Sequence, residues 1–179
     1  MRAASIMQGM RRLVKKQAPK RVALKCDDVV AKALAVLEPE MRRQGVELSV
    51  SGCPDLPDIF ADDVQIQQVL VNLIRNAIDA MKDTECGARK LTISTRLHTV
   101  AEVALRVADS GPGITPDHAL AMFDAFNTTK NDGMGLGLTI CRSIAERHNG
   151  RLIFEQVQPR GAALSLVLPV AQGQSEDEQ

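Results

Sequence analysis

Amide and carboxylate side chains recur along one side of an otherwise apolar segment, QQVLVNLIRNAIDAM at 67–81. Asn72, Asn76 and Asp79 lie four and three residues apart, which places them side by side if the segment is helical. An amide oxygen can bind Mg²⁺ when phosphates and water supply the other ligands, and a buried amide is costly without a partner. The alternative is a row of polar side chains that face solvent.

An aspartate and two glycines follow a predicted strand in the sequence DSGPGI at 109–114. Gly111 and Gly113 permit an unusual backbone path and the close approach of a flat ligand. The carboxylate of Asp109 can accept a hydrogen bond from an exocyclic amine such as N6 of adenine. A tight loop without a ligand is the alternative, because the same residue types favour turns.

The segment FDAFNTTK at 123–130 combines an apolar anchor with side chains suited to phosphate. Its two Phe residues lie three apart, so that one turn can anchor its apolar side. Thr128, Thr129 and Lys130 then offer two hydroxyls and a cation as phosphate contacts. The alternative is a surface loop held by the two Phe residues.

Three alternate glycines, Gly133, Gly135 and Gly137, lead into a predicted helix in GMGLGLTI at 133–140. Backbone N–H groups at a helix N-terminus bind anions, most often phosphate. The spacing is not the dinucleotide-binding fingerprint, because no strand immediately precedes it, and no Gly-Lys-Ser/Thr follows as in a Walker A loop. A lone glycine triplet is therefore weak evidence of function.

These segments must be positioned by a fold in which helices and strands alternate. The periodicity predicts helices at 1–17, from Asp27 or Asp28 to about Gln44, at 62–82 and at 136–148, a short apolar turn at 118–126, and strands at 21–26, 46–50, 59–61, 90–97, 101–108, 151–157 and 162–168. The alternation favours a two-layer α/β sandwich with a mixed sheet. The long glycine-rich stretch at 109–137 is typical of a functional segment.

Local residue types set the expected helix ends. Asp27 or Asp28 can cap the second helix, and Gly45 stops it. Pro39 is expected to kink or split that helix. Asn149-Gly150 is a good signature for the end of the last helix. The first helix, 1–17, has an apolar stripe that must pack elsewhere, either on its own domain or in a bundle.

Composition limits the classes of function. The 179 residues fit one domain, with or without an appended element. Lys plus Arg and Asp plus Glu are both 22, so that the net charge is zero, and the aromatic residues are four Phe. These values argue against nucleic-acid binding. No apolar run approaches the ~20 residues of a membrane span, and no signal-peptide pattern is present. We expect no membrane contact and a cytoplasmic location.

Four cysteines stand at positions 26, 53, 86 and 141. Their spacings are long and irregular, and no Cys-x-x-Cys pair is present, so a zinc site is poorly supported. Two disulfides would be compatible with the number. Without a secretory signal, a reduced chain with free thiols is the better expectation.

Taken together, in this order and spacing, the four segments resemble the N, G1, F and G2 boxes of the catalytic ATP-binding domain of sensor histidine kinases. The resemblance covers residues 21–170, nearly the whole chain. The run NTTKNDGMGLGLTICRSIAERHNGRL is particularly similar to kinases coupled to PAS-type sensors, including the FixL-like oxygen sensors.

The resemblance implies a Bergerat fold, an α/β sandwich with helices on one face of a mixed sheet and ATP between the helical layer and a mobile lid at 122–137. It implies that Asn76 holds Mg²⁺, that Asp109 reads the adenine amine, and that Asn76 and Lys130 are catalytic. The residues implied to bind ATP and Mg²⁺ are Asn72, Asn76, Asp79, Asp109, Gly111, Gly113, Thr128, Thr129, Lys130, Gly133, Gly135, Leu136 and Gly137. Ala163 stands where many relatives carry Thr near the adenine, so a water or a backbone group is expected to serve there.

The residue four before Asn76 bears on the type of reaction. ATPases of the same fold, such as gyrase, resemble the pattern Glu-x-x-x-Asn, in which the Glu is the general base for water. Here that position is Asn72, an amide that cannot take a proton. The resemblance therefore favours phosphoryl transfer to a protein His over hydrolysis. A nucleotide-binding adaptor or an anti-sigma-type serine kinase of the same fold is the alternative.

None of the three histidines, His98, His118 and His148, stands in the acceptor context of such kinases, and a surface or capping role is expected for each. The acceptor His is therefore expected on a bundle domain absent from this chain, which alone should not autophosphorylate. The expected division is 1–18 as the end of the bundle helix, 21–170 as the catalytic domain and 171–179 as a disordered tail. The resemblance also implies a full-length homodimer and a response regulator receiver domain as partner.

Overall fold

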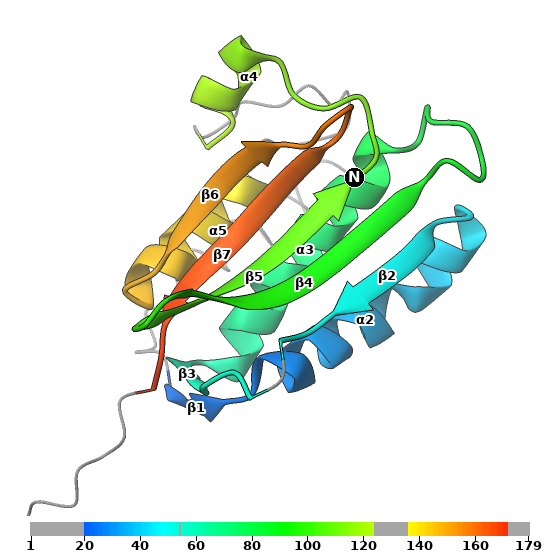
Figure 1. Ribbon diagram of the computed structural model, residues 1–179. Coiled ribbons are helices and arrows are strands. Elements are labelled where there is room, and N and C mark those ends of the chain that lie inside the picture. The colour runs from blue at the N-terminus through cyan, green and yellow to red at the C-terminus, as the bar shows by residue number, and fades with distance from the viewer. Residues whose placement is uncertain (1–19, 54, 124–135, 172–179) are drawn as a thin grey trace, which may run out of the picture.

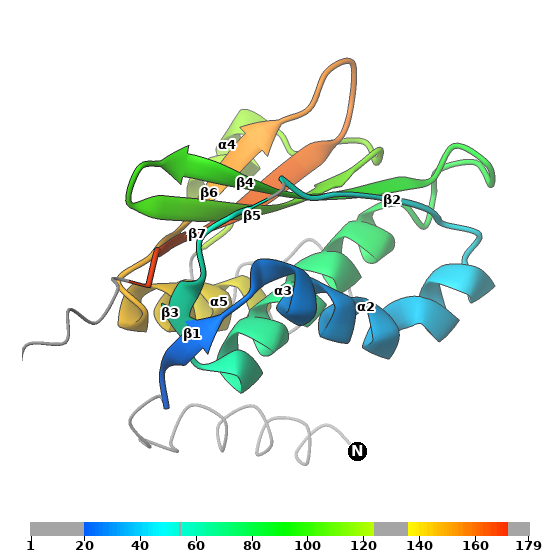
Figure 2. The same ribbon diagram turned by 60° about the horizontal axis from the view of Figure 1, so that its bottom comes forward.

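The polypeptide forms a sheet covered on one face by helices (Figures 1 and 2). The computed structural model describes residues 20–53, 55–123 and 136–171. Its strands are β1 (Val22–Leu24), β2 (Glu47–Ser51), β3 (Ile59–Ala61), β4 (Lys90–Thr99), β5 (Glu102–Asp109), β6 (Arg151–Gln156) and β7 (Ala162–Pro169). Its helices are α2 (Cys26–Arg43), α3 (Asp63–Ala80), α4 (Pro116–Ala121) and α5 (Gly137–Arg147). The predicted helix at 1–17 lies outside the described residues.

The main sheet is mixed, as predicted. Its strand order is β2-β4-β5-β7-β6, in which β2 and β4 are parallel and the other pairs are antiparallel. Asp109, the last residue of β5, lies opposite Leu91 of β4. Paired residues point to the same face of a sheet, and Leu91 belongs to the core on the helical side. The side chain of Asp109 therefore points toward the helices.

The core lies between the sheet and the helices α2, α3 and α5 (Figure 2). Alternate residues of the central strands, such as Ile93 and Leu105, meet the apolar face of α3, which contributes Leu70 and Ile74. Helix α3 packs against α2 on one side and α5 on the other. Burial of these side chains is the main stabilising term, at about 1.5–3 kcal/mol for each large apolar residue.

The start of α2 differs from the prediction. The helix begins at Cys26 with Lys25 as its N-cap, and no side chain caps it. Neither Asp27 nor Asp28 is the cap, which corrects the expectation drawn from their type. Both carboxylates lie in the first turn, where a negative charge is favourable beside the positive end of the helix dipole.

Pro39 lies inside α2 and does not split it. Its ring is exposed, whereas Leu37 and Met41 on either side of it are buried against the core. The apolar face thus continues past the proline, and its packing outweighs the missing backbone hydrogen bond. Gly45, with φ +62°, ends this segment as predicted.

The remaining elements lie close to their predicted places. The predicted apolar turn at 118–126 begins with the short helix α4, and residues 124–126 lie outside the described residues. At the end of α5, Asn149 adopts φ +57° and the N–H of Gly150 bonds the carbonyl of Ala145 at 2.9 Å, so the predicted stop is confirmed. All four cysteines are free thiols, as predicted. In the described part of the chain, no helix is both long and apolar enough to cross a membrane.

Both ends of the described domain are tied to one corner. β1 and β3 pair as a separate two-stranded sheet, and the backbone N–H of Lys20 donates to Asp62 just after β3 at 2.9 Å. Val170 forms a bridge to β3. The N–H of Ala171, predicted as the first residue of the tail, bonds the carbonyl of Asp58 at 2.6 Å. Residues 172–179 lie outside the described part.

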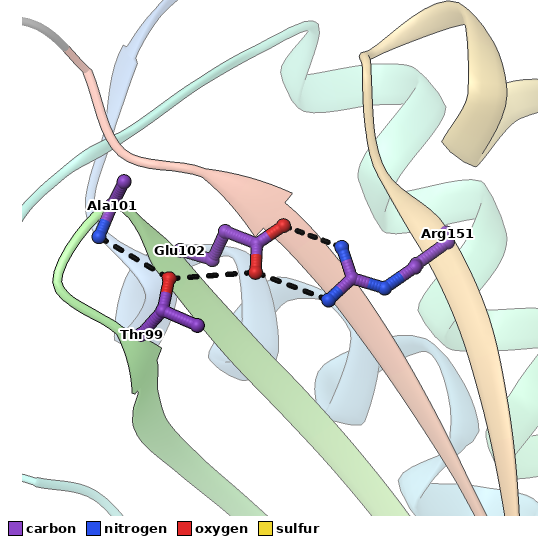
Figure 3. A network of polar contacts seen from close by, with 4 residues as sticks. All are labelled: Thr99, Ala101, Glu102 and Arg151. Atoms are coloured by element: carbon purple, nitrogen blue, oxygen red, sulfur yellow. Dashed lines mark hydrogen bonds and ion pairs between the residues drawn. The ribbon is translucent and has the colours of Figure 1, made fainter.

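The face of the sheet away from the helices carries ion pairs that reach across β7. Arg106 of β5 contacts Glu155 of β6 at 3.1 Å. Figure 3 shows the second pair, in which the two terminal nitrogens of the Arg151 guanidinium donate to the carboxylate of Glu102. The hydroxyl of Thr99 donates to the same carboxylate at 3.4 Å. Exposed pairs of this kind contribute little to stability, because solvent screens them.

His148 joins the end of α5 to the start of α3. Its side chain is fully buried. Nδ1 bonds the carbonyl of Ile144 at 2.8 Å, and Nε2 accepts from the backbone N–H of Asp62 at 3.1 Å. These partners require the neutral ring with its proton on Nδ1. His148 therefore caps α5, which was one of its two predicted roles. Its side chain is buried and does not lie on the surface, which was the other.

We predict that His148 makes stability depend on pH. Burial lowers the pKa of His148 below its ordinary value, so the unfolded chain binds a proton more readily than the folded chain. Stability is therefore lost as the pH falls through about 6.5, with a slope of up to about 1.4 kcal/mol per pH unit. Urea unfolding between pH 5 and 7.5 measures this slope. His148→Gln should flatten it and His118→Gln, an exposed control, should not; equal slopes in all three proteins would contradict the prediction.

Candidate nucleotide site

Helix α3 supplies the row of polar side chains predicted at 67–81. The side chain of Asp62 caps the helix by accepting the N–H of Gln65 at 3.1 Å. Residues 73, 74, 77 and 78 are buried, whereas Asn72, Asn76 and Asp79 are half-buried. The helix thus turns its apolar face to the core and leaves the polar row at the border of the core.

Asn72 contacts the first two turns of α5. Its Nδ2 donates to Sγ of Cys141 at 3.1 Å. A Cβ atom added to Gly137 would lie 2.9 Å from Oδ1 and 3.0 Å from Nδ2 of the same amide. The helix that follows the glycine-rich segment therefore starts directly against the predicted site row, and a side chain at its first position would displace the Asn72 amide.

Asp79 pairs with a lysine on the next turn. Its Oδ1 lies 2.6 Å from Nζ of Lys82, and this hydrogen bond raises the pKa of Lys82. The ion pair is partly exposed and therefore weak. Asn76, the middle residue of the row, is half-buried and lies about one turn before the end of α3.

Asp109 is a buried carboxylate at the end of β5, with an exposed fraction of 9%. Its Oδ1 accepts the N–H of Gly111 at 2.9 Å, and a backbone hydrogen bond from Ala162 is also present. Burial raises the pKa of Asp109, and these two donors oppose the rise. A carboxylate has about four acceptor positions, so room remains for a donor from a ligand.

Glycines permit the close packing around Asp109. A Cβ on Gly111 would lie 2.9 Å from Oδ1 of Asp109 and 3.1 Å from the carbonyl oxygen of Ala80, at the end of α3. Gly113 has φ +82°. Gly161 has φ +122°, and a Cβ there would overlap the carbonyl oxygen of Asp109. Residues 109–114 therefore pack between the end of α3 and the connection from β6 to β7.

The predicted site residues fall into two groups. Asn72, Asn76, Asp79, Asp109, Gly111, Gly113, Leu136 and Gly137 are described, whereas Thr128, Thr129, Lys130, Gly133 and Gly135 lie outside the described residues, with most of the predicted lid. The structure brings Asn72, at the middle of α3, next to Gly137, and it brings Gly111, which bonds Asp109, next to Ala80 at the C-terminal end of α3. Asn72 and Ala80 are about 12 Å apart along the helix.

Three partners in this region escaped the sequence reasoning. Cys141 binds Asn72, Gly161 faces the backbone of Asp109, and the backbone of Ala162 bonds its carboxylate. Ala162 lies next to Ala163, the position at which a water or a backbone group was expected to replace the Thr of many relatives near the adenine. The glycine at 161 was the one visible signal, because a strand start rarely needs glycine.

Comparison with known proteins decides what this site belongs to. A family model described as histidine kinase-, DNA gyrase B-, and HSP90-like ATPase matches residues 61–172, which hold every predicted site segment. The chain belongs to this family. Within it, the fold resembles the catalytic domain of the histidine kinase ThkA, with a TM-score of 0.75 and 27% identity over 84% of this chain and 96% of that one.

Curated relatives indicate the sensor kinase branch of the family. The C4-dicarboxylate transport sensor protein DctS of Rhodobacter capsulatus is 39% identical over 171 residues, 96% of this chain and 26% of that protein. The sensor protein FixL of Bradyrhizobium diazoefficiens is 36% identical over 171 residues, 96% of this chain and 34% of that protein. The chain is thus an ATP-binding catalytic domain of the sensor histidine kinase type, and it spans about a third or less of these relatives.

The packing around Asp109 predicts different costs for two glycine substitutions. Gly161→Ala and Gly87→Ala both place a side chain at positive φ, but nothing lies within 4 Å of the added Cβ at Gly87. We expect Gly87→Ala to cost about 1 kcal/mol of unfolding free energy, and Gly161→Ala about 3 kcal/mol or more because its Cβ also meets the Asp109 backbone. Denaturant unfolding measures both. Similar losses in the two variants would show that the contact at Gly161 is unimportant.

Proposed function

We propose that this domain binds Mg-ATP and donates the γ-phosphoryl group to a histidine on a separate bundle domain. The observation that carries the proposal is the buried carboxylate of Asp109, which has two backbone donors and acceptor positions left over. A ligand amine, such as N6 of adenine, would add a hydrogen bond to a charge that burial has made costly.

The polar row of α3 is consistent with a nucleotide that extends along the helix from Asp109. Adenine would lie at the Ala80 end of α3 beside Asp109, and the phosphates would lie toward Asn72 and the start of α5. The first N–H groups of α5, from Gly137 onward, are suited to phosphate. The predicted phosphate contacts of Thr128, Thr129, Lys130, Gly133 and Gly135 belong to the same proposal.

The donor set fits Mg²⁺ held mainly by the nucleotide. Among the described residues, no group of three His, Cys, Asp or Glu side chains could hold a metal ion. Mg²⁺ prefers oxygen ligands and keeps several waters, so one amide oxygen from Asn76 with phosphate oxygens and water is a suitable set. The ion would neutralise phosphate charge, and Asn76 would orient it.

The amide side chain of Asn72 and its hydrogen bond favour a kinase over an ATPase. The proposed mechanism needs no protein base at this position, because phosphoryl transfer to an imidazole relies on positioning and charge neutralisation. An amide whose nitrogen donates to Cys141 cannot activate water. The attacking histidine is proposed to lie on another domain, because none of His98, His118 and His148 stands in an acceptor context, and His148 is also fully buried.

The wider assembly follows from the same proposal. Residues 1–18 would be the end of a bundle helix, and the full-length kinase would be a cytoplasmic homodimer that phosphorylates a response regulator receiver domain. ThkA has also been solved in complex with a response regulator protein, TrrA, which supports a receiver domain as the type of partner. The alternative is an adaptor or an anti-sigma-type serine kinase.

We predict that Asp109→Asn weakens ATP binding by roughly 10- to 150-fold, because a charge-assisted hydrogen bond contributes about 1.5–3 kcal/mol. Calorimetric titration with ATP, with and without Mg²⁺, measures this loss. Asp83→Asn, an exposed substitution close to the end of α3, is the matched control and should bind normally. GTP should bind poorly to the native chain, because guanine carries a carbonyl where adenine carries the amine. Absence of ATP binding in the native chain would favour the adaptor.

We predict that the chain alone does not label itself with ATP. Addition in trans of a bundle fragment with a His-Glu/Asp acceptor, taken from a sensor kinase such as the relatives above, should give acid-labile phosphate on that fragment. Its His→Gln variant is the control. Covalently bound phosphate on this chain that is lost in acid, with ATP as the only donor, would contradict the proposal.

A further inference from the structure

The thiol of Cys141 is a buried partner of the predicted site row. Its residue is 1% exposed and lies in the second turn of α5. Besides the hydrogen bond from Nδ2 of Asn72 at 3.1 Å, its Sγ lies 4.0 Å from the carbonyl oxygen of Val69, to which the S–H can point. Both partners of the sulfur thus belong to α3.

The sulfur remains a neutral thiol. Burial raises the pKa of Cys141 to about 12, and the hydrogen bond from Asn72 opposes that rise. A neutral thiol can accept one N–H and donate its own S–H, although both bonds are weak. Cys141 is therefore neither a nucleophile nor a metal ligand at neutral pH.

The direction of the Asn72 amide follows from these contacts. Because the S–H of Cys141 points to the carbonyl of Val69, the sulfur can only accept a hydrogen bond from the Asn72 amide. Nδ2 is the donor atom of that amide, so Nδ2 faces the sulfur. Oδ1 is then the acceptor of the amide that remains at Gly137, where an added Cβ would lie 2.9 Å from Oδ1 and 3.0 Å from Nδ2. One amide therefore meets α5 at positions 137 and 141, which lie on the same helical face.

We propose that Cys141 is a positioning residue of the nucleotide site, and that its sulfur holds the Asn72 amide so that Oδ1 faces the start of α5. Cys141 acts through Asn72 and touches no ligand itself. Oδ1 would then be an acceptor suited to a water on Mg²⁺ when Mg-ATP is bound. This inference rests on the proposed function for its effect on nucleotide binding, but the orientation of the amide does not.

Nuclear magnetic resonance of the nucleotide-free chain tests the orientation directly. The side-chain NH₂ of Asn72, assigned through its loss in Asn72→Asp, should contain one proton that exchanges slowly with water. In Cys141→Val, which replaces the thiol by methyl groups and has no acceptor, both protons should exchange quickly; in Cys141→Ser, the slow proton should return. Fast exchange of both protons in the native chain would overturn the proposal, even if neither Cys141 variant folds.

Calorimetry with ATP tests the consequence for the site. Loss of a group that orients a ligand commonly weakens metal binding 10- to 100-fold, so Cys141→Val should weaken Mg-ATP binding by about tenfold and ATP binding without Mg²⁺ by less. Cys141→Ser should recover most of the affinity. Cys26→Val is the matched control, because Cys26 is a buried thiol in α2 with a pKa also raised to about 12.

The outcomes separate the two proposals. If the native chain binds no ATP, the proposed function fails, and the exchange of the Asn72 protons still decides the role of Cys141. If the native chain binds Mg-ATP and Cys141→Val binds it equally well, the positioning role is wrong. A loss of similar size in Cys26→Val, or no rescue in Cys141→Ser, would assign the effect to packing and would also overturn the proposal.

Discussion

Helix α3 must bury an apolar face and present a polar row at the same time, and the arrangement of the domain follows from this requirement. The sheet, α2 and α5 together cover its apolar residues. The polar row is left along the border, where Asn72 meets α5 and Ala80 meets Gly111. A rotation of α3 would bury unpaired amides or expose Leu and Ile side chains, and both are costly. Core packing therefore fixes the orientation of the site.

The sequence was sufficient for most of the fold, because the relevant signals are local. Alternation in β4, β5 and β7 and the period of α3 gave these elements within a few residues, and Gly45 and Asn149 ended their helices as predicted. The predictions for the N-cap of α2 and for a break at Pro39 failed, because local rules compete there with tertiary packing. An aspartate beside a helix start resembles a cap, and a proline resembles a break, unless the flanking apolar residues are known to be buried.

The candidate site was predictable to a different degree. Linear motifs identified Asp109 and the α3 row, because these residues recur at fixed spacing within one element. Their partners come from distant segments. Nothing in the neighbourhood of Cys141 indicates that its sulfur meets an amide 69 residues earlier, and a buried His148 cannot be told from a surface histidine at a helix end. Such contacts depend on how helices pack, which local patterns do not specify.

The shared corner of the two chain ends has a mechanical consequence. Lys20 and Ala171 both bond the connection around β3, whereas Asp109 lies at the opposite end of β5, about 23 Å away at the rise of a strand. A force transmitted through either end therefore acts at one point, and the domain can swing about it as a lever. The Asp109 end, which lies away from that corner, would then move as a whole while the internal geometry of the site remains undisturbed.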